Sequence, residues 1–167
     1  MVADEARLEE KAGIKAIWYP KGKRPIIKIN TSKKAKSFYG ALNVKSGKEH
    51  AKYYEWQNQE NTIDFLKYLR KLYPLKKIIL FWDGAPWHKG KKIRNYLKRT
   101  KNLLIIFFPP YSPELNPQEI VWRIARKKVS HNHQEENIDI LANNFLRFLL
   151  RTRFKTNFLI KFGVNLI

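Results

Sequence analysis

Two apolar stretches, IILFWD (78–83) and LLIIFF (103–108), decide the fold predicted for this chain of 167 residues. The first stretch stops at Asp83, and the second stops at Pro109-Pro110. Short unbroken apolar runs of this kind are typical of strands buried on both faces, as in a parallel or mixed sheet. The carboxyl ends of such strands are where open α/β sheets bind their ligands, so Asp83 is at once a candidate functional residue.

The sequence on either side of these two stretches shows the spacing of apolar residues that is typical of helices. Apolar residues recur at helical spacing after Asn58, with Asn61 or Thr62 available as N-cap, and Pro74 ends that helix. Asn116-Pro117-Gln118-Glu119 is typical of a helix start, with Asn as N-cap and Pro at the first helical position. Two more helices are predicted over 90–100 and from Ile138 to about Arg153, the last with Ile138, Leu141, Phe145 and Leu149 facing inward.

The first third of the chain predicts antiparallel strands instead. Short strands are expected at 17–19 and 26–29, on either side of a turn at 20–23, and again at 37–44 and 50–56. A meander followed by alternating helices and strands implies a mixed sheet with helices packed on it.

Composition limits the function classes. The chain has 34 Lys and Arg against 14 Asp and Glu, a formal net charge of +20, and no cysteine. A disulfide scaffold and a thiolate metal site are therefore excluded. No apolar run is long enough for a membrane span and no secretory signal is present, so we expect a soluble protein of the cytoplasm. A positive field of this size favours a polyanionic partner, most often nucleic acid.

Three residues are candidates for chemistry, and each has a structural alternative. Asp83 directly follows a predicted strand, but aspartate is also a common residue in turns, where its role is structural. Glu119, third residue of its predicted helix, could complete a capping box with Asn116. His88 could act as an acid or base, or it could be a hydrogen-bonded structural histidine. Trp87 and Trp122 could stack on bases, although aromatics beside buried strands are more often core residues.

Two groups of basic residues adjoin these acids and favour phosphate contacts. They are Lys89, Lys91 and Lys92 after Asp83, and Arg123, Arg126 and Lys127 after Glu119. His131 and His133 are interpreted as solvated loop residues without a metal role.

Two segments, FWDGAPWHKG (81–90) and LIIFFPPYSPELNPQEIVW (104–122), resemble the catalytic core of insertion-sequence transposases of the mariner superfamily. ADEAR (3–7) is similar to the segment that carries this family's first acid, and Trp18, Pro20, Gly22 and Pro25 match its later pattern. The resemblance covers most of residues 1–150. It implies an α/β, ribonuclease H-like fold, with a five-stranded mixed sheet and helices on both faces, over 1–154, followed by an unassigned tail over 155–167.

The resemblance also implies a function. The family's three acids carry over to Asp4, Asp83 and Glu119, which would hold two Mg²⁺ or Mn²⁺ ions for cleavage and strand transfer of DNA at the ends of a mobile element. His88 would be an accessory residue, and the six basic residues above would hold the DNA backbone. The expected site of action is the DNA of a prokaryotic cytoplasm, and a homodimer is compatible with the family.

The chain's start departs from the family in one respect. Family members carry helix-turn-helix domains before the catalytic core, whereas only three residues precede Asp4. We therefore expect a truncated first strand that holds Asp4 weakly, poor nicking by the chain alone, and an upstream helix-turn-helix polypeptide as partner. The alternative from another class is a basic, nucleic-acid-binding remnant of a split or decayed transposase, which keeps the fold but cannot cleave.

Overall fold

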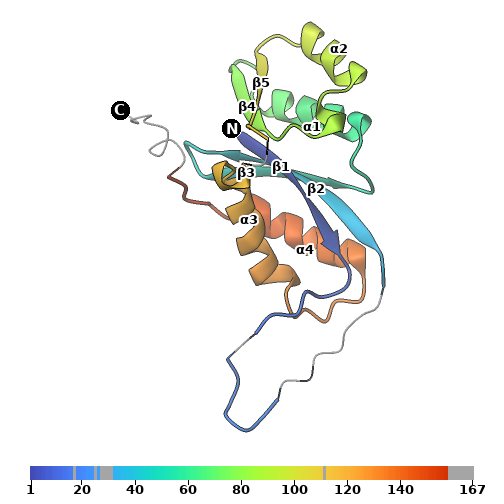
Figure 1. Ribbon diagram of the computed structural model, residues 1–167, viewed down its shortest axis with the longest axis vertical. Coiled ribbons are helices and arrows are strands. Elements are labelled where there is room, and N and C mark those ends of the chain that lie inside the picture. Colours follow the sequence, from blue (N-terminus) through green and yellow to red (C-terminus); the bar gives the residue numbers. More distant parts are fainter. Residues whose placement is uncertain (17, 25, 27–31, 111, 158–167) are drawn as a thin grey trace.

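A computed structural model of the chain describes residues 1–16, 18–24, 26, 32–110 and 112–157. Its centre is a five-stranded sheet in the order β3-β2-β1-β4-β5 (Figure 1). The strands are β1 (Val2–Glu9), β2 (Ala35–Asn43), β3 (Lys48–Tyr54), β4 (Ile78–Trp82) and β5 (Leu103–Phe107). β2 is antiparallel to both of its neighbours, β1 and β3, whereas β4 and β5 run parallel to β1, so the sheet is mixed as predicted.

Helices cover both faces of the sheet (Figure 1). α1 (Gln59–Leu72) packs on one face with α2 (Lys91–Arg99) beside it, and α3 (Gln118–Ala125) and α4 (Ile138–Arg151) pack on the other. The α1 side buries Tyr39, Phe65 and Trp82, and the α3–α4 side buries Phe38 and Phe145 among other apolar residues. No helix among the described residues is both long and apolar enough to cross a membrane.

The helix predictions agree closely with the structure. α4 buries Ile138, Leu141, Phe145 and Leu149, as its spacing predicts. The N-cap predicted for α1 is wrong by three or four residues, because the side chain of Asn58 accepts from the Asn61 backbone N–H. α3 begins at Gln118 with Pro117 in the N-cap position, one residue later than predicted, but the Asn116 side chain accepts from the Gln118 N–H at 3.0 Å, as a capping side chain does.

The strand predicted at 17–19 is wrong for the residues that the structure describes there. The first strand is β1, and Trp18 and Tyr19 lie in irregular chain, fully and half exposed, because no neighbouring strand pairs with them. Residue 17 and most of the strand expected at 26–29 lie outside the described residues. The described residues from 18 to 24 lie well away from the sheet (Figure 1).

The expected burial of β4 and β5 on both faces is also wrong. Ile78, Leu80 and Trp82 are buried toward α1, but Ile79 on the other face is 41% exposed. β5 is an edge strand, with Leu104 and Ile106 at 45% and 39% exposure. α3 and α4 cover β1 to β3 and stop short of this part of the sheet (Figure 1). The apolar runs therefore predicted the positions of these strands correctly, but they did not predict how much of each sheet face the helices cover.

β1 is better supported than the sequence suggests. All its eight residues pair with β2, and Asp4 lies opposite Gly40. Only one pair, Val2 with Phe81, joins β1 to β4, supplemented by bonds of Met1 to Ile79 and Phe81. The expectation that few ladder bonds hold Asp4 is thus wrong on the β2 side, where the ladder is continuous.

Gly40 is the position where helix α3 comes closest to the sheet. A Cβ built there would lie 2.4 Å from Gln118 Nε2, 2.5 Å from Glu49 Oε1 and 2.6 Å from Trp122 Cη2. Real Cβ atoms do not approach other atoms so closely, so only glycine lets α3 pack at this depth. Because Gly40 pairs with Asp4, this contact also sets the distance between α3 and the acid on β1.

We expect Gly40→Ala to lower the free energy of unfolding by about 1–3 kcal/mol, the usual cost of overpacking a core. Urea denaturation followed by circular dichroism measures it. Gly13→Ala is the matched control, because its Cβ would meet only the His131 ring, at 3.2 Å, and its cost should stay within about 0.5 kcal/mol. Equal stability of Gly40→Ala and the unaltered chain would show that α3 can move away from the sheet.

Candidate active site

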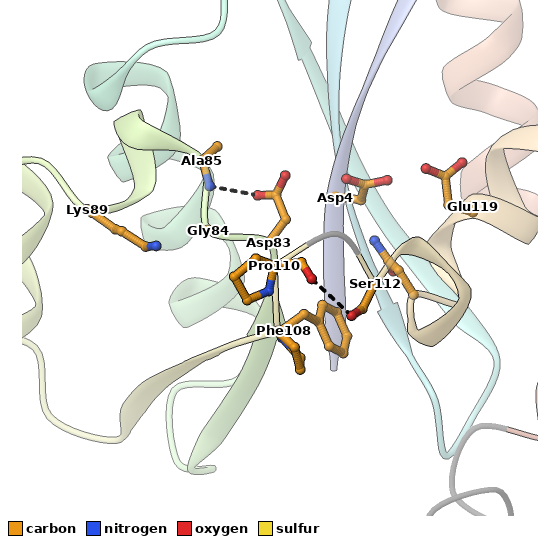
Figure 2. Close-up of a pocket in the computed structure, with 11 residues that line it drawn as sticks. Asp4, Asp83, Gly84, Ala85, Lys89, Phe108, Pro110, Ser112 and Glu119 are labelled. Carbon is orange, nitrogen blue, oxygen red and sulfur yellow. Dashed lines mark hydrogen bonds between the residues drawn. The ribbon is translucent and has the colours of Figure 1, made fainter.

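Asp4, Asp83 and Glu119 line one cavity of about 450 Å³. Asp4 is the third residue of β1, Asp83 directly follows β4, and Glu119 is the second residue of α3. Because Val2 pairs with Phe81 in parallel register, Asp4 and Asp83 lie two residues beyond that pair on adjacent strands. Figure 2 shows the Asp4 carboxylate between those of Asp83 and Glu119. The structure thus brings the three predicted acids together at one end of the sheet.

Asp4 is the most strongly perturbed of the three. Burial, together with the negative charges of Glu5 and Glu119, raises the pKa of Asp4 to about 7. The indole N–H of Trp122 on α3 donates to Asp4 Oδ2 at 3.1 Å, which favours the ionised form and fixes the carboxylate. Trp122 is 1% exposed, so it is a core residue that orients Asp4 and is closed to bases.

Asp83 is held by a buried histidine. His88 Nδ1 lies 2.8 Å from Asp83 Oδ1, and His88 Nε2 lies 2.7 Å from Glu5 Oε1. Burial opposes the charge on His88, but hydrogen bonds to Asp83 and Glu5 outweigh it and raise the pKa of His88 to about 9. Burial likewise works against the charge on Asp83, yet the hydrogen bond from His88 lowers its pKa. At neutral pH an imidazolium therefore bridges two carboxylates.

Glu5 and Asp4 use opposite faces of the same strand. Side chains alternate along β1, so Asp4 faces α3 and Glu5 faces the α1 side, where Trp82 Nε1 donates to its second oxygen at 3.3 Å. Glu5 is a residue that the sequence reasoning missed. Its signal was its place next to a candidate acid on a strand, with a histidine in the turn after the neighbouring strand.

A second missed pair lies beneath α3. Gln118 Nε2 donates to Glu49 Oε1 at 2.7 Å, and both residues are completely buried. Burial raises the pKa of Glu49 well above its ordinary value, with the Asp4 charge adding to the effect. The bond from Gln118 to Glu49 therefore ties the first turn of α3, and with it Glu119, to strand β3.

The predicted cationic residues divide into separate groups. Lys89 lines the acidic cavity, and its Nζ lies 5.0 Å from the centre of the Phe107 ring. Lys91 and Lys92 begin α2, and Lys92 forms an ion pair with Glu60 on α1. Arg123 and Arg126 line an adjoining cavity that shares Glu119, while Lys127 is exposed in the π-helical turn over 126–130. His131 also lines that adjoining cavity, whereas the Nδ1 of His133 accepts from the Glu135 N–H at 3.0 Å and its Nε2 is buried. The prediction that both are solvated loop residues is therefore wrong, because packing covers part of each ring.

Two sets of residues could hold a metal ion. Glu5, Asp83 and His88 each offer a ligand atom, all within 4.8 Å of one another, but His88 already bonds to both carboxylates, and the side chains of His88 and Glu5 are buried. The second set is Asp4, Asp83 and Glu119, whose carboxylate oxygens face the acidic cavity. Hard divalent cations such as Mg²⁺ take oxygen ligands, and the crowded negative charge at Asp4 favours a cation there. The second set therefore fits the chemistry of such ions.

The sheet has the order β3-β2-β1-β4-β5, and acids lie on its central strand, at the end of the next strand and at a helix start. This arrangement defines a ribonuclease H-like catalytic core. Solved structures share the fold. The Mos1 mariner paired-end complex with Mn superposes with a TM-score of 0.67 over 98% of this chain and 51% of that one, at 16% identity. The catalytic domain of the Mos1 mariner transposase gives 0.58, at 16% identity, over 98% and 74%. The core domain of BIV integrase gives 0.51, at 18% identity, over 77% and 86%.

The sequence identifies the family. The profile of the DDE superfamily endonuclease family matches residues 1–142, so the chain belongs to that family. A 39 kDa protein of insertion element IS630 from Shigella sonnei is 28% identical over 134 residues, covering 78% of this chain and 38% of that protein. The protein y4pE/y4sA of Sinorhizobium fredii is 46% identical over 66 residues, covering 40% and 46%. The chain thus spans less than half the length of these relatives.

Removing the bridging histidine should destabilise the domain. We expect His88→Ala to lower the free energy of unfolding by about 3–5 kcal/mol, because it leaves the buried Glu5 carboxylate without its partner. Adding Glu5→Gln should restore part of the loss, since it removes the stranded charge. Urea denaturation of both single variants and the double variant forms the cycle that measures the coupling. Strictly additive losses would mean that the two side chains do not interact.

Glu49 should make stability depend on pH. Its pKa is raised in the folded state, so folding holds a proton that the unfolded chain releases near pH 4.5. The contribution of Glu49 is therefore complete below that pH and is lost as pH rises through the folded pKa. We expect Glu49→Gln to gain stability relative to the unaltered chain between pH 4 and neutral pH, measured by thermal unfolding at each pH. A constant difference would place Glu49 at an ordinary pKa.

Proposed function

We propose that this chain is the catalytic domain of a DNA transposase that cleaves phosphodiesters at the ends of a mobile element and joins the freed ends to a target. The single observation that supports this most directly is the convergence of Asp4, Asp83 and Glu119 on one cavity. Family membership and the insertion-element relative point to the same function. The cytoplasm of a prokaryotic cell is the proposed place of action.

The three acids would hold two divalent cations, Mg²⁺ or Mn²⁺. Asp4, central among the three, would contact both ions, Asp83 one and Glu119 the other. When bound, such ions activate an attacking oxygen and stabilise a leaving oxygen at a phosphorus atom. Among the solved structures with this fold, Mos1 complexes contain Mn and Mg, which supports divalent cations without fixing their number here.

The chain's own residues have the following roles in cleavage. Trp122 holds Asp4 through its indole N–H, and His88, anchored by Glu5, holds Asp83, so both are positioning residues. Lys89 and the arginines after Glu119 would contact backbone phosphates. Hydrolysis forms a bond from a water oxygen to phosphorus and breaks the bond to the 3′ oxygen, leaving a 3′ hydroxyl. That hydroxyl is then the nucleophile for strand transfer.

Partners other than DNA belong to the proposal as well. The family resemblance points to a helix-turn-helix polypeptide that recognises the element's ends, and we propose it as a protein partner. A homodimer is compatible with the function. The alternative of a basic remnant that binds DNA but cannot cleave is not favoured, because the cavity keeps all three carboxylates.

We expect Asp4→Asn, Asp83→Asn and Glu119→Gln each to reduce Mn²⁺-dependent nicking of DNA by at least about 100-fold, since each removes a metal ligand worth several kcal/mol. Glu136→Gln, at an exposed carboxylate in the loop before α4, is the matched control and should keep full activity. The assay follows relaxation of supercoiled plasmid, with Mn²⁺ binding measured separately by calorimetry. Asp4→Asn should melt no earlier than the unaltered chain, because it removes a repulsive buried charge.

The chain is assayed alone and with the helix-turn-helix region added, which should raise nicking. If the folded chain neither binds Mn²⁺ nor nicks DNA in either form, the remnant alternative is correct. Should Glu119→Gln alone keep full activity, Glu119 serves only the start of α3.

A further inference from the structure

A basic cavity adjoins the acidic one on the α3 side. It has a volume of about 360 Å³ and is lined by Lys15, Glu119, Ile120, Arg123, Arg126 and His131. Glu119 also lines the acidic cavity, so the two cavities share a wall. Three cations from two separate segments therefore gather beside a single carboxylate of the candidate active site.

Lys15 comes from the long segment between β1 and β2, and its backbone is fastened in place. Its N–H donates to Asn132 Oδ1 at 2.9 Å, and its carbonyl accepts from Asn132 Nδ2 at 2.9 Å. The Asn132 N–H donates in turn to the carbonyl of Gly13 at 3.1 Å, beside a parallel bridge between Gly13 and His131. This Asn132 clamp leaves the Lys15 side chain exposed and free of a structural role.

The conformation of Asn132 suits the clamp. Its φ is +54°, a left-handed value that asparagine adopts more readily than most residues. The turn after the π-helical segment therefore directs both polar atoms of the Asn132 side chain toward the backbone of Lys15. Because the clamp binds only backbone atoms, it fixes where Lys15 lies whatever its side chain does.

The cations of this cavity have no acidic partner in the part of the chain that the structure describes. The ion pairs there involve other basic residues, such as Lys36, Lys52 and Lys92. Burial and the charges of Lys15 and Arg126 lower the pKa of His131, which agrees with a concentrated positive field. Guanidinium groups bind phosphate through two parallel hydrogen bonds, and lysine adds a point charge.

We propose that Lys15, Arg123 and Arg126 form a phosphate subsite that binds a DNA backbone phosphate flanking the scissile one, with Asn132 as the residue that positions Lys15. This inference rests on the proposed function, because it assumes that DNA enters the acidic cavity. Figure 2 shows Lys89 on the Asp83 side of the three carboxylates, and the subsite adjoins Glu119 at their other end. A backbone bound to both would cross the three carboxylates.

The test measures binding of the full chain to a short fluorescein-labelled DNA duplex by anisotropy over a range of NaCl concentrations. Each phosphate contact contributes a slope of about −0.9 to the plot of log affinity against log salt. Lys15→Gln should therefore make the slope shallower by about 0.9. Lys71→Gln is the matched control, because Lys71 is an exposed lysine at the end of α1, near the start of β4 and away from Asp83.

Asn132→Gly tests the positioning role, since glycine keeps the left-handed backbone and removes only the side-chain amide. It should weaken binding and make the slope shallower, although it removes no charge. The double variant with Lys15→Gln should bind no more weakly than Lys15→Gln alone. Additive losses in the double variant would overturn the clamp.

The outcomes separate the subsite from the proposed function. If Lys15→Gln matches Lys71→Gln while Arg123→Gln makes the slope shallower, Lys15 contacts no phosphate and the subsite is overturned, but the DNA-binding function stands. If the unaltered chain shows no salt-dependent DNA binding at all, the proposed function fails and the subsite with it. Circular dichroism melting of each variant confirms that a changed slope reports binding and not unfolding.

Discussion

Negative charge concentrated at one end of the sheet is the constraint on which the rest of the structure depends. Asp4 is buried between Glu5 and Glu119, and its pKa is raised accordingly, so the site opposes its own ionisation. Folding proceeds in spite of this repulsion because each acid is separately held. Trp122 donates to Asp4, His88 bridges Asp83 and Glu5, and Glu119 sits on a helix start capped by Asn116. The negative charge that these contacts do not neutralise faces the cavity.

Residues on both faces of β1 hold the acids in place. On the α3 side, Gly40 lets the helix approach closely enough for Trp122 and Gln118 to reach the strands. On the α1 side, His88 stacks near Trp82 with ring centres 4.1 Å apart and supplies the positive charge that the two carboxylates need. Positioning residues therefore come from both layers of helices. Changing either layer moves one acid relative to the others.

Sequence patterns predicted the elements that local rules govern. The strand at 78–82, the capping side chain of Asn116 and the inward face of α4 follow from an apolar run, helix capping and periodicity, and each is confirmed, although the strand is not buried on both faces. The pairing partner of β1 and the open face of β5 depend on neighbours far away in the sequence, so short apolar segments at 17–19 were mistaken for strands. Motif resemblance supplied Asp4, which has no local signal of its own. Sequence patterns did not predict Glu5 and Glu49, which help to position the acids, or Lys15 of the adjoining cavity, because all three acquire their roles only through tertiary contacts.

A net charge of +20 indicates a polyanion but does not say where it binds. Much of the positive charge here serves other ends, since Lys36, Lys52 and Lys92 are neutralised by acids within the domain. A cation that is held by backbone bonds, faces a cavity and lacks an internal partner is more informative than a dense run of lysines. Lys15 meets that description, and together with Arg123 and Arg126 it lies beside Glu119, where these cations offset the repulsion between that carboxylate and a phosphate. An acidic site that must bind a polyanion needs such cations at its rim, because a cation bound between the carboxylates neutralises the scissile phosphate but not its neighbours.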